Sequence, residues 1–465
     1  MLSFGTGIVA AFAFTAPACH EMRDLDNNNN KNDPKNNVKN CQKFQKLCKS
    51  IGTSADNGGD LLKLTAEKGN DRGVRITQRI DAGSEILRIP LSKCLRDDRP
   101  PEWLDRATSS VMVEDDYETH VDKWSTRLAA SLIDLDMNPP LDKVEEEEED
   151  FVALWKSLLP DPSTLRASLP VHWSDEALAS TQCAALELAS DAAFFARAEA
   201  VNALLDGIAI SCEEVDVKND SEIGELEVQQ ALDLVQTRSC RVRRHNGVGP
   251  ALRLLAPVFD FINHGSALHS NAVFDLEDDG LDMNYVISAD VSKLEKEPAL
   301  VVRASRDIDA GEEILIDYGD SARPEWKCLS SYGFVPKSCA ILVDDFDDEV
   351  EDCSSAEIYM DGKRYEIGPS IVPTDLVLDV ADTLRVKTGM KIDEEDSNPL
   401  TADVALSIAK RVSDVAGDLL DFEPEEGRSP AEQQAFQVAS QLRRSQHDIL
   451  ISCAAGLRDY AASAA

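Results

Sequence analysis

Several features that would point to other classes of protein are missing from this sequence of 465 residues. Although 43% of the residues are hydrophobic, no run of about 18 apolar residues occurs, so we expect no transmembrane helix and no membrane partner. A glycine-rich strand-to-helix loop followed by an acidic residue is also missing, which argues against a Rossmann-type cofactor site and a phosphate-binding loop. The apolar content is sufficient for folded cores, and the length allows two or three domains.

Basic residues are scarce relative to acidic ones. The chain has 47 Lys and Arg against 86 Asp and Glu, which gives a net charge of −39. Phosphates would be repelled by such a surface, so we expect no nucleic-acid partner. The charge would suit a basic protein partner through long-range attraction, and simple solubility is the alternative explanation. Two acidic runs, 145–150 and 344–349, carry much of the excess and are typical of solvated loops.

Cysteine pairs at metal-binding spacing are lacking as well. The eleven cysteines are scattered, with no Cys-x-Cys or Cys-x-x-Cys pair among them. Their odd number and spacing indicate free, mostly buried thiols in a reducing compartment. Because a tetrahedral zinc cluster needs such pairs, we predict no metal site.

The N-terminal segment has two interpretations. Residues 4–18 are apolar and small but have no basic segment before them, as a signal peptide would. The junction between Ala13 and Phe14 is similar to the cleavage site of plastid pre-sequences in algae with complex plastids. An ordinary ragged terminus or a wrongly assigned start codon, in a protein of the cytoplasm or nucleus, is the alternative. The Lys/Asn-rich stretch that follows, to about residue 50, is typical of disorder, so we assign 1–58 to a targeting or disordered segment.

An internal echo marks two distant points of the chain. The phrase Ile80-Asp-Ala-Gly-Ser-Glu-Ile-Leu87 recurs as Ile308-Asp-Ala-Gly-Glu-Glu-Ile-Leu315. In each copy an Asp-Ala-Gly turn separates short β-type runs, which predicts a strand-turn-strand unit. The two hairpins could face each other across one β-rich fold, or a common turn sequence has simply occurred twice.

Helical periodicity fills the sequence between these copies and returns after them. From about 96 to 236 apolar residues recur three and four positions apart, as in 124–133 and 184–210. After Val343 we expect an acidic loop, a hairpin and then helices. The expected hairpin is 359–365, and the expected helices are 376–386, 402–422 and 431–460, with Pro373, Pro399 and Pro430 near their starts.

Three short phrases carry polar residues in apolar surroundings. Asp260-Phe-Ile-Asn-His264 has apolar residues on both sides, so its polar groups must be hydrogen-bonded, either in a network that holds a turn or in a binding site. Asp317-Tyr318-Gly319 places a tyrosine at a strand end, where such residues usually pack with the hydroxyl at the rim. Tyr332-Gly-Phe334 follows.

The order of these phrases resembles the cofactor and lysine sites of SET-domain protein methyltransferases, in the Rubisco large-subunit methyltransferase-like branch. The resemblance covers 60–95 and 230–336, and the phrases 155–161 and 169–173 are similar to the helical insert of that branch. It implies an α+β protein with a β-rich SET fold of crossed, pseudoknot-like segments, split by a helical insert and followed by a mainly helical domain. The bounds that we expect are a SET domain at 59–336 (core 59–95 and 233–336, insert 96–232) and a C-terminal substrate-binding-like domain at 337–465.

The resemblance also implies S-adenosylmethionine as the methyl donor. Asn263 would offer its amide to the amino-acid end of the donor, the main chain of His264 would pair with the adenine edge, and Phe334 would stack on the adenine. The side chain of His264 would help to join the two crossing segments.

Two weaker matches add donor-binding residues. The stretch 70–74 is similar to the Glu-Gly-x-Gly-Leu loop of the family, whose backbone surrounds the donor, so Arg72 and Gly73 are assigned to it although Asn70 stands where an acid is common. The stretch 236–240 is similar to the Ser-Arg-x-Phe phrase, whose arginine binds the donor's carboxylate bidentately. That assigns Arg238, with an ordinary surface ion pair as the alternative.

For the acceptor side, the resemblance assigns catalysis and a donor contact to Tyr318, a wall of the lysine channel to Tyr332, and a substrate contact to Asp260. Methyl transfer needs a deprotonated amine in line with the methyl group. Free lysine has a pKa of about 10.4, so an apolar channel would help by lowering it, and a tyrosine hydroxyl can orient the amine.

The function expected is therefore a monomeric protein-lysine N-methyltransferase acting on a lysine-bearing, non-histone protein. Two alternatives stay open. The acceptor could be histidine, since a neutral imidazole needs less deprotonation, or the chain could be a non-catalytic SET-fold binding module.

Overall fold

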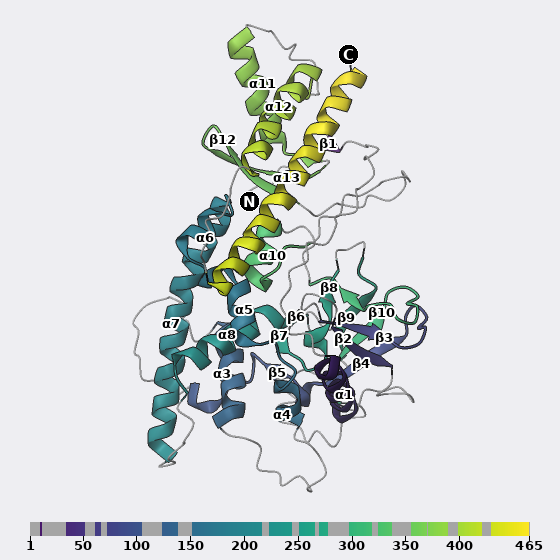
Figure 1. Ribbon diagram of the computed structural model, residues 1–465, viewed down its shortest axis with the longest axis vertical. Coiled ribbons are helices and arrows are strands. Elements are labelled where there is room, and N and C mark those ends of the chain that lie inside the picture. Colours follow the sequence, from purple (N-terminus) through teal and green to yellow (C-terminus); the bar gives the residue numbers. More distant parts are fainter. Residues whose placement is uncertain are drawn as a thin grey trace, which may run out of the picture. The chain divides into compact units, whose positions relative to one another are not determined.

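The chain forms two compact units in the computed structural model (Figure 1). One unit comprises 26–166 and 194–319, and the other comprises 1–25, 167–193 and 320–465. We call them the sheet unit and the helical unit and describe each by itself. The residues that the structure describes are 10–11, 34–51, 61–66, 72–104, 123–137, 151–215, 223–243, 251–265, 269–277, 297–318, 324–336, 355–369, 371–388, 399–420 and 429–464.

The sheet unit is built around a five-stranded sheet of order β4-β10-β9-β11-β8. The first three strands pair in antiparallel fashion, while β11 runs parallel to both β9 and β8. The apolar run of β10 is buried along almost its whole length, as expected for a central strand. The bounds are β4 Glu85–Pro90, β8 Asn263–His264, β9 Ala272–Glu277, β10 Ala299–Ala304 and β11 Leu315–Ile316.

Smaller sheets complete the β-structure of this unit. One has three antiparallel strands in the order β5-β7-β6, and the other is the pair β2-β3. Their bounds are β2 Leu62–Ala66, β3 Arg72–Ile76, β5 Leu95–Arg96, β6 Cys240–Val242 and β7 Leu252–Leu255.

The two copies of the internal echo lie against each other. Ile80 and Ile308 exchange two backbone hydrogen bonds of 2.9 Å, and the Ala82 amide donates to the Asp307 carboxylate at 2.9 Å. The glycine of the first turn has a φ of 81° and that of the second has 87°, a conformation that glycine adopts without strain. Of the two interpretations, the pairing of similar hairpins is therefore confirmed.

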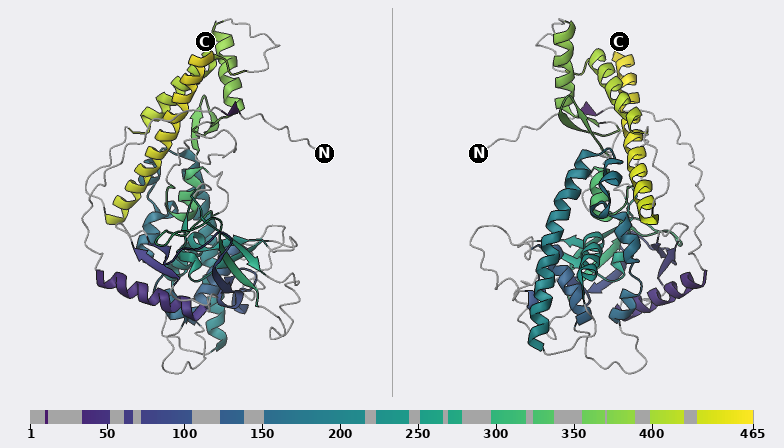
Figure 2. Two further views of the ribbon diagram at one scale, coloured as in Figure 1. Left: turned by 90° about the vertical axis from the view of Figure 1, so that its right-hand side faces the viewer. Right: turned by 60° about the vertical axis from the view of Figure 1, so that its left-hand side comes forward.

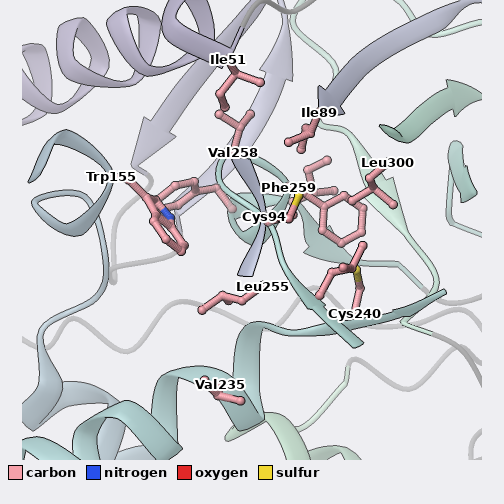
Figure 3. Close-up of a cluster of buried hydrophobic side chains, with 14 of the residues drawn as sticks. Ile51, Ile89, Cys94, Trp155, Val235, Cys240, Leu255, Val258, Phe259 and Leu300 are labelled. Carbon is pink, nitrogen blue, oxygen red and sulfur yellow. The ribbon is translucent and has the colours of Figure 1, made fainter. Parts of the chain in front are cut away.

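Helices cover the sheets of this unit and close its apolar core, part of which Figure 3 shows. In α1 the residues Phe44, Leu47, Cys48 and Ile51 share one face and are buried in the core, and the helix itself lies against β2 (Figure 2). The expectation of disorder up to residue 50 was therefore wrong for this stretch. The bounds are α1 Pro34–Ile51, η1 Leu91–Lys93, α3 Trp124–Met137, α4 Phe151–Lys156, α8 Glu225–Arg238 and η4 Phe259–Phe261.

The helical unit contains the hairpin and the C-terminal helices that the sequence predicts. β12 and β13 pair through a turn at Asp361 and Gly362, both with positive φ, as a two-residue hairpin turn requires. The helices α12 and α13 run side by side (Figure 2) and bury apolar side chains between them. The bounds are α6 Asp175–Ala179, η3 Pro170–His172, α10 Glu325–Tyr332, β12 Ala356–Met360, β13 Lys363–Ile367, α11 Thr374–Thr388, α12 Ala402–Asp418 and α13 Pro430–Ala464.

Four further elements complete the description. Helices α5 (Pro162–Ser168) and α7 (Ala184–Val215) begin in one unit and end in the other, and β1 (Ala10–Ala11) pairs with β14 (Ile371–Val372). The predicted α+β class is confirmed by these strands and helices, whereas the expected domain bounds stay a prediction. None of the helices within the described ranges has the length and apolar character that a membrane span requires.

Candidate active site

Two chain segments about 50 residues apart meet at β8 and β11. Asn263 lies opposite Leu315 and His264 opposite Ile316, in parallel register, and the amide of Gly265 donates to the Ile316 carbonyl at 2.9 Å. A Cβ atom on Gly265 would lie 2.9 Å from the Cβ of Leu315 and 3.0 Å from the backbone nitrogen of Ser270. Only a glycine fits at this position, so Gly265 allows the two segments to approach each other closely.

The side chain of Asn263 ties β8 to the start of β3. Its Nδ2 donates to the carbonyl of Arg72 at 2.7 Å and to Oε1 of Glu313 at 2.8 Å. A Cβ on Gly73 would lie 2.2 Å from the same Glu313 oxygen and 3.2 Å from Asn263 Nδ2. The structure therefore brings Arg72, Gly73 and Asn263 together, and it adds Glu313, which the sequence analysis did not assign although it lies in the Gly-Glu-Glu phrase of the second echo.

His264 and Tyr318 connect the two segments on the other side of this junction. The backbone N–H of Tyr318 donates to His264 Nδ1 at 3.4 Å, the two rings are 5.2 Å apart, and the Tyr318 hydroxyl donates to the carbonyl of Ile262 at 2.9 Å. Burial lowers the pKa of His264, while Asp317 acts in the opposite direction. The imidazole is therefore neutral at pH 7, which leaves Nδ1 able to accept the Tyr318 hydrogen bond.

Asp260 lies shortly before Asn263 in the chain. Together with Arg238, from the end of α8, it forms a second polar group. Asp260 is only 6% exposed, its Oδ2 accepts from Trp155 Nε1 at 3.1 Å, and its carbonyl accepts from Arg238 Nη1 at 2.5 Å. Its Oδ1 has no hydrogen-bond partner within the described part of the chain. Burial raises the pKa of Asp260 to about 6, against the lowering effects of Arg238, Trp155, its own backbone amide and Arg72.

The guanidinium of Arg72 lies against the segment that follows α4. Its Nη1 donates to the carbonyl of Leu158 at 2.7 Å. Burial lowers the pKa of Arg72, and the nearby charge of Arg238 lowers it further. The role of Trp155 in this group was missed by the sequence analysis, whose only signal was that the phrase 155–161 resembles the family's insert.

Tyr332 and Phe334 belong to the helical unit. Their rings are stacked 6.1 Å apart at the C-terminal end of α10, on either side of Gly333, whose φ of 79° is typical of a residue that ends a helix. A Cβ on Gly333 would lie 2.6 Å from the hydroxyl oxygen of Ser168. The other seven predicted site residues all lie in the sheet unit, while Asn70 and Gly319 fall outside the described residues.

Comparison with known proteins adds the family. A model of the SET domain matches residues 71–319, which is more than half of the chain. The chain belongs to the SET-domain family. The predicted membership of that family is therefore confirmed, and the match runs from the start of β3 to just beyond Tyr318.

Solved SET-domain structures are similar to this chain at low identity. The crystal structure of the SET domain of LSMT bound to lysine and AdoHcy has 13% identity and a TM-score of 0.47, covering 92% of this chain and 91% of that chain. The same domain bound to methyllysine and AdoHcy has 14% identity and a TM-score of 0.48, covering 91% and 92%. Rubisco LSMT bound to AdoMet has 13% identity and a TM-score of 0.43, covering 91% and 92%. Among the curated proteins, none matches this sequence.

In this SET domain the described residues include no group of three or more His, Cys, Asp or Glu side chains arranged to hold a metal ion. The site contains amide, imidazole, hydroxyl, guanidinium and carboxylate groups, with Gly73 and Gly265 at close-packed backbone positions. Such groups can bind a charged organic ligand and orient an amine, and they can do so through hydrogen bonds alone.

Proposed function

We propose that this chain is an S-adenosylmethionine-dependent protein-lysine N-methyltransferase that acts on a non-histone protein. The observation that carries the proposal is the junction of β8 and β11 inside a SET domain, at which Asn263 donates to Glu313 and the Tyr318 amide donates to His264. The acidic chain, with its net charge of −39, suits a lysine-bearing protein of basic character as substrate.

Features of this chain fit the donor. Gly73 and Gly265 stand where a Cβ would collide with Glu313 and Leu315, so glycine lets the segments around Asn263 pack closely together. Arg238 Nε is buried and has no hydrogen-bond partner among the described residues, so its guanidinium keeps capacity to donate to a carboxylate. The hydrogen bonds from Asn263 to Arg72 and Glu313 are both donated by Nδ2, which leaves Oδ1 as the atom suited to an ammonium group.

When bound, the donor supplies a methyl group carried by a sulfonium. The residues proposed to hold it are Arg72 and Gly73 through their backbone, Arg238, Asn263, His264, Tyr318 and Phe334. For the acceptor we propose Tyr332 as a wall of the lysine channel, and Asp260 as a substrate contact that stays a prediction.

Tyr318 is proposed to orient the acceptor amine. Its hydroxyl donates its hydrogen to the Ile262 carbonyl, so toward a neutral amine the oxygen would act as an acceptor of the amine N–H. This arrangement favours positioning of the amine over removal of its proton by the tyrosine. Alignment of the amine is the main requirement of an in-line methyl transfer, because little other covalent chemistry is needed.

The test is incubation of the purified protein with methyl-labelled S-adenosylmethionine and a cell extract, followed by mapping of the modified residue. We expect label on lysine of one or a few extract proteins, and none with Tyr318→Phe. Label on histidine would overturn the lysine assignment while keeping the reaction class. Donor binding without any transfer would favour the non-catalytic binding module.

A further inference from the structure

One buried hydrogen bond connects the helical insert to the site segment. Trp155 of α4 is 1% exposed, and its Nε1 donates to Oδ2 of Asp260 at 3.1 Å, across 105 positions of sequence. Figure 3 shows Trp155 in the apolar cluster that also contains Val258 and Phe259, the two residues before Asp260. A hydrogen bond to a carboxylate in such surroundings is stronger than in water, because solvent cannot compete for either partner.

Two arginines from different elements place their charges near this carboxylate. Arg238 ends α8 and Arg72 begins β3. Each stabilises the ionised form of Asp260, whereas the two guanidinium groups repel each other, since Arg238 lowers the pKa of Arg72. Asp260 is therefore the negative charge that offsets the repulsion between them.

The backbone around Asp260 is held by the same group. Its N–H donates to the Ala256 carbonyl at 3.1 Å and its carbonyl accepts from Arg238. Val258 has a φ of 71° although it is β-branched and fully buried, a conformation that costs free energy and persists only when the surroundings enforce it. The turn over 256–260 is thus strained and depends on its contacts.

This turn leads directly to the atoms that the site uses. Two residues after Asp260, the carbonyl of Ile262 accepts from the Tyr318 hydroxyl, and Asn263 then donates to the carbonyl of Arg72. A shift of the turn would therefore displace both the hydroxyl proposed to orient the amine and the amide proposed to bind the donor.

We propose that Trp155 and Asp260 form a positioning pair: the indole N–H holds the ionised carboxylate beside Arg72 and Arg238, and the carboxylate fixes the turn that presents Ile262 and Asn263 to the site. Neither residue needs to touch the donor for this role. The role in donor binding rests on the proposed function, whereas the role in holding the turn does not.

The chain offers a matched control. Trp103 is 6% exposed in the same unit, and its Nε1 donates to Oδ1 of Asp134 at 2.9 Å. The variants to compare are Trp155→Phe and Trp103→Phe, each of which removes one buried indole and its bond to a carboxylate, together with Asp260→Asn, which keeps an acceptor for Trp155 but removes the charge.

Donor binding is measured first, by calorimetry with S-adenosylmethionine from pH 5 to pH 8. We expect Trp155→Phe and Asp260→Asn to weaken binding at least tenfold at pH 7.5, and Trp103→Phe to stay within twofold of the wild type. Wild-type affinity should fall as Asp260 is protonated near pH 6, because the arginines then lose their shared counter-charge. The fall should begin at higher pH in Trp155→Phe, since the lost N–H no longer lowers the pKa of Asp260, and it should be absent in Asp260→Asn.

Hydrogen exchange of the backbone amides of 259–264, measured without donor, separates the two proposals. We expect faster exchange there in Trp155→Phe than in Trp103→Phe. Equal affinity and equal exchange in these two variants would overturn the positioning pair, and so would wild-type affinity in Asp260→Asn. If the wild type binds no donor while exchange still distinguishes the two variants, the proposed function is wrong and the pair is upheld as the support of the turn.

Discussion

Around β8 and β11 buried and half-buried polar side chains hold one another, whereas α12 and α13 meet through apolar side chains. In the sheet unit one carboxylate oxygen of Asp260 has no partner among the residues that the structure describes, and Val258 has a strained backbone. Between the helices, Val404, Ile408 and Leu450 follow the periodicity of an amphipathic pair and are fully buried. The first region therefore has features that cost stability, whereas the second is packed in a way that favours stability. This difference is expected when the first region carries the reaction and the second supports the fold.

Loss of the Tyr318 hydroxyl should have the largest effect on methyl transfer and tests this difference first. Tyr318→Phe should reduce methyl transfer by about 10²–10³-fold, because the group that orients the acceptor amine is gone, whereas donor binding should weaken much less, because Tyr318 is one of several residues proposed to hold the donor. Tyr460→Phe is the matched control in the helical unit, since the Tyr460 hydroxyl also donates to a backbone carbonyl, that of Leu400, at 2.9 Å. Turnover with labelled donor decides between them. Equal turnover in both variants would show that Tyr318 has no special role.

Substitution of glycine by alanine should weaken donor binding at Gly73 and increase stability at Gly417. In Gly73→Ala the new Cβ meets Glu313 Oε1 at 2.2 Å, so Glu313 and Asn263 must move and donor affinity should fall at least tenfold. In Gly417→Ala, within α12, the Cβ meets nothing within 4 Å, and the helix should become more stable by about 0.5–1 kcal/mol. Calorimetry with the donor and urea unfolding measure the two effects. A loss of affinity in Gly417→Ala, or none in Gly73→Ala, would contradict the contrast.

The contributions of Asp260 and Asp379 to the free energy of unfolding should depend on pH in opposite directions. The pKa of Asp260 is raised by burial to about 6, so the stability that its protonated form provides is present below about pH 4 and lost as the pH rises through 6. Asp260→Asn should therefore gain stability relative to the wild type as the pH rises, by about 1–3 kcal/mol at pH 7.5, although it binds the donor less well. Urea unfolding at pH 4.5 and pH 7.5 measures this gain.

Asp379, the more exposed of the two carboxylates, should show the opposite dependence of stability on pH. Lys363 holds the pKa of Asp379 below its ordinary value, with a further contribution from Tyr365. Its stabilising effect is present above about pH 4 and lost as the pH falls, so Asp379→Asn should be less stable than the wild type at pH 7.5 and approach it in acid. The same sign of change in both variants would show that burial does not distinguish the two carboxylates.

The sequence predicted the helical region better than the site contacts, and the reason is physical. Periodicity is a local signal, and it anticipated α12 and α13 to within a few residues. It was also present at Phe44, Leu47 and Ile51, but the Lys/Asn-rich composition of that stretch was given more weight, and α1 was missed.

The candidate site residues were assigned through a family pattern, which says nothing of their hydrogen-bond partners, and their roles stay a prediction. The bond of Glu313 to Asn263 spans 50 positions and that of Trp155 to Asp260 spans 105. Asn271, which is buried and accepts from the Leu315 amide at 2.9 Å, was missed for the same reason. Such pairings depend on how distant segments meet, and no local pattern in one sequence contains that information.

The smallest effect concerns the end of a helix in the region that obeys the local rules. Thr401 precedes α12, and its hydroxyl accepts from the Val404 amide at 3.4 Å, which satisfies one of the free N–H groups of the first turn. Thr401→Ala should lower the free energy of unfolding by about 1 kcal/mol, and Thr401→Ser should restore most of it because the acceptor oxygen is kept. Urea unfolding measures both variants. Donor affinity and methyl transfer should not change, since the substitution removes only a local cap, and a loss of turnover in Thr401→Ala would mean that α12 supports the reaction more directly than its apolar packing indicates.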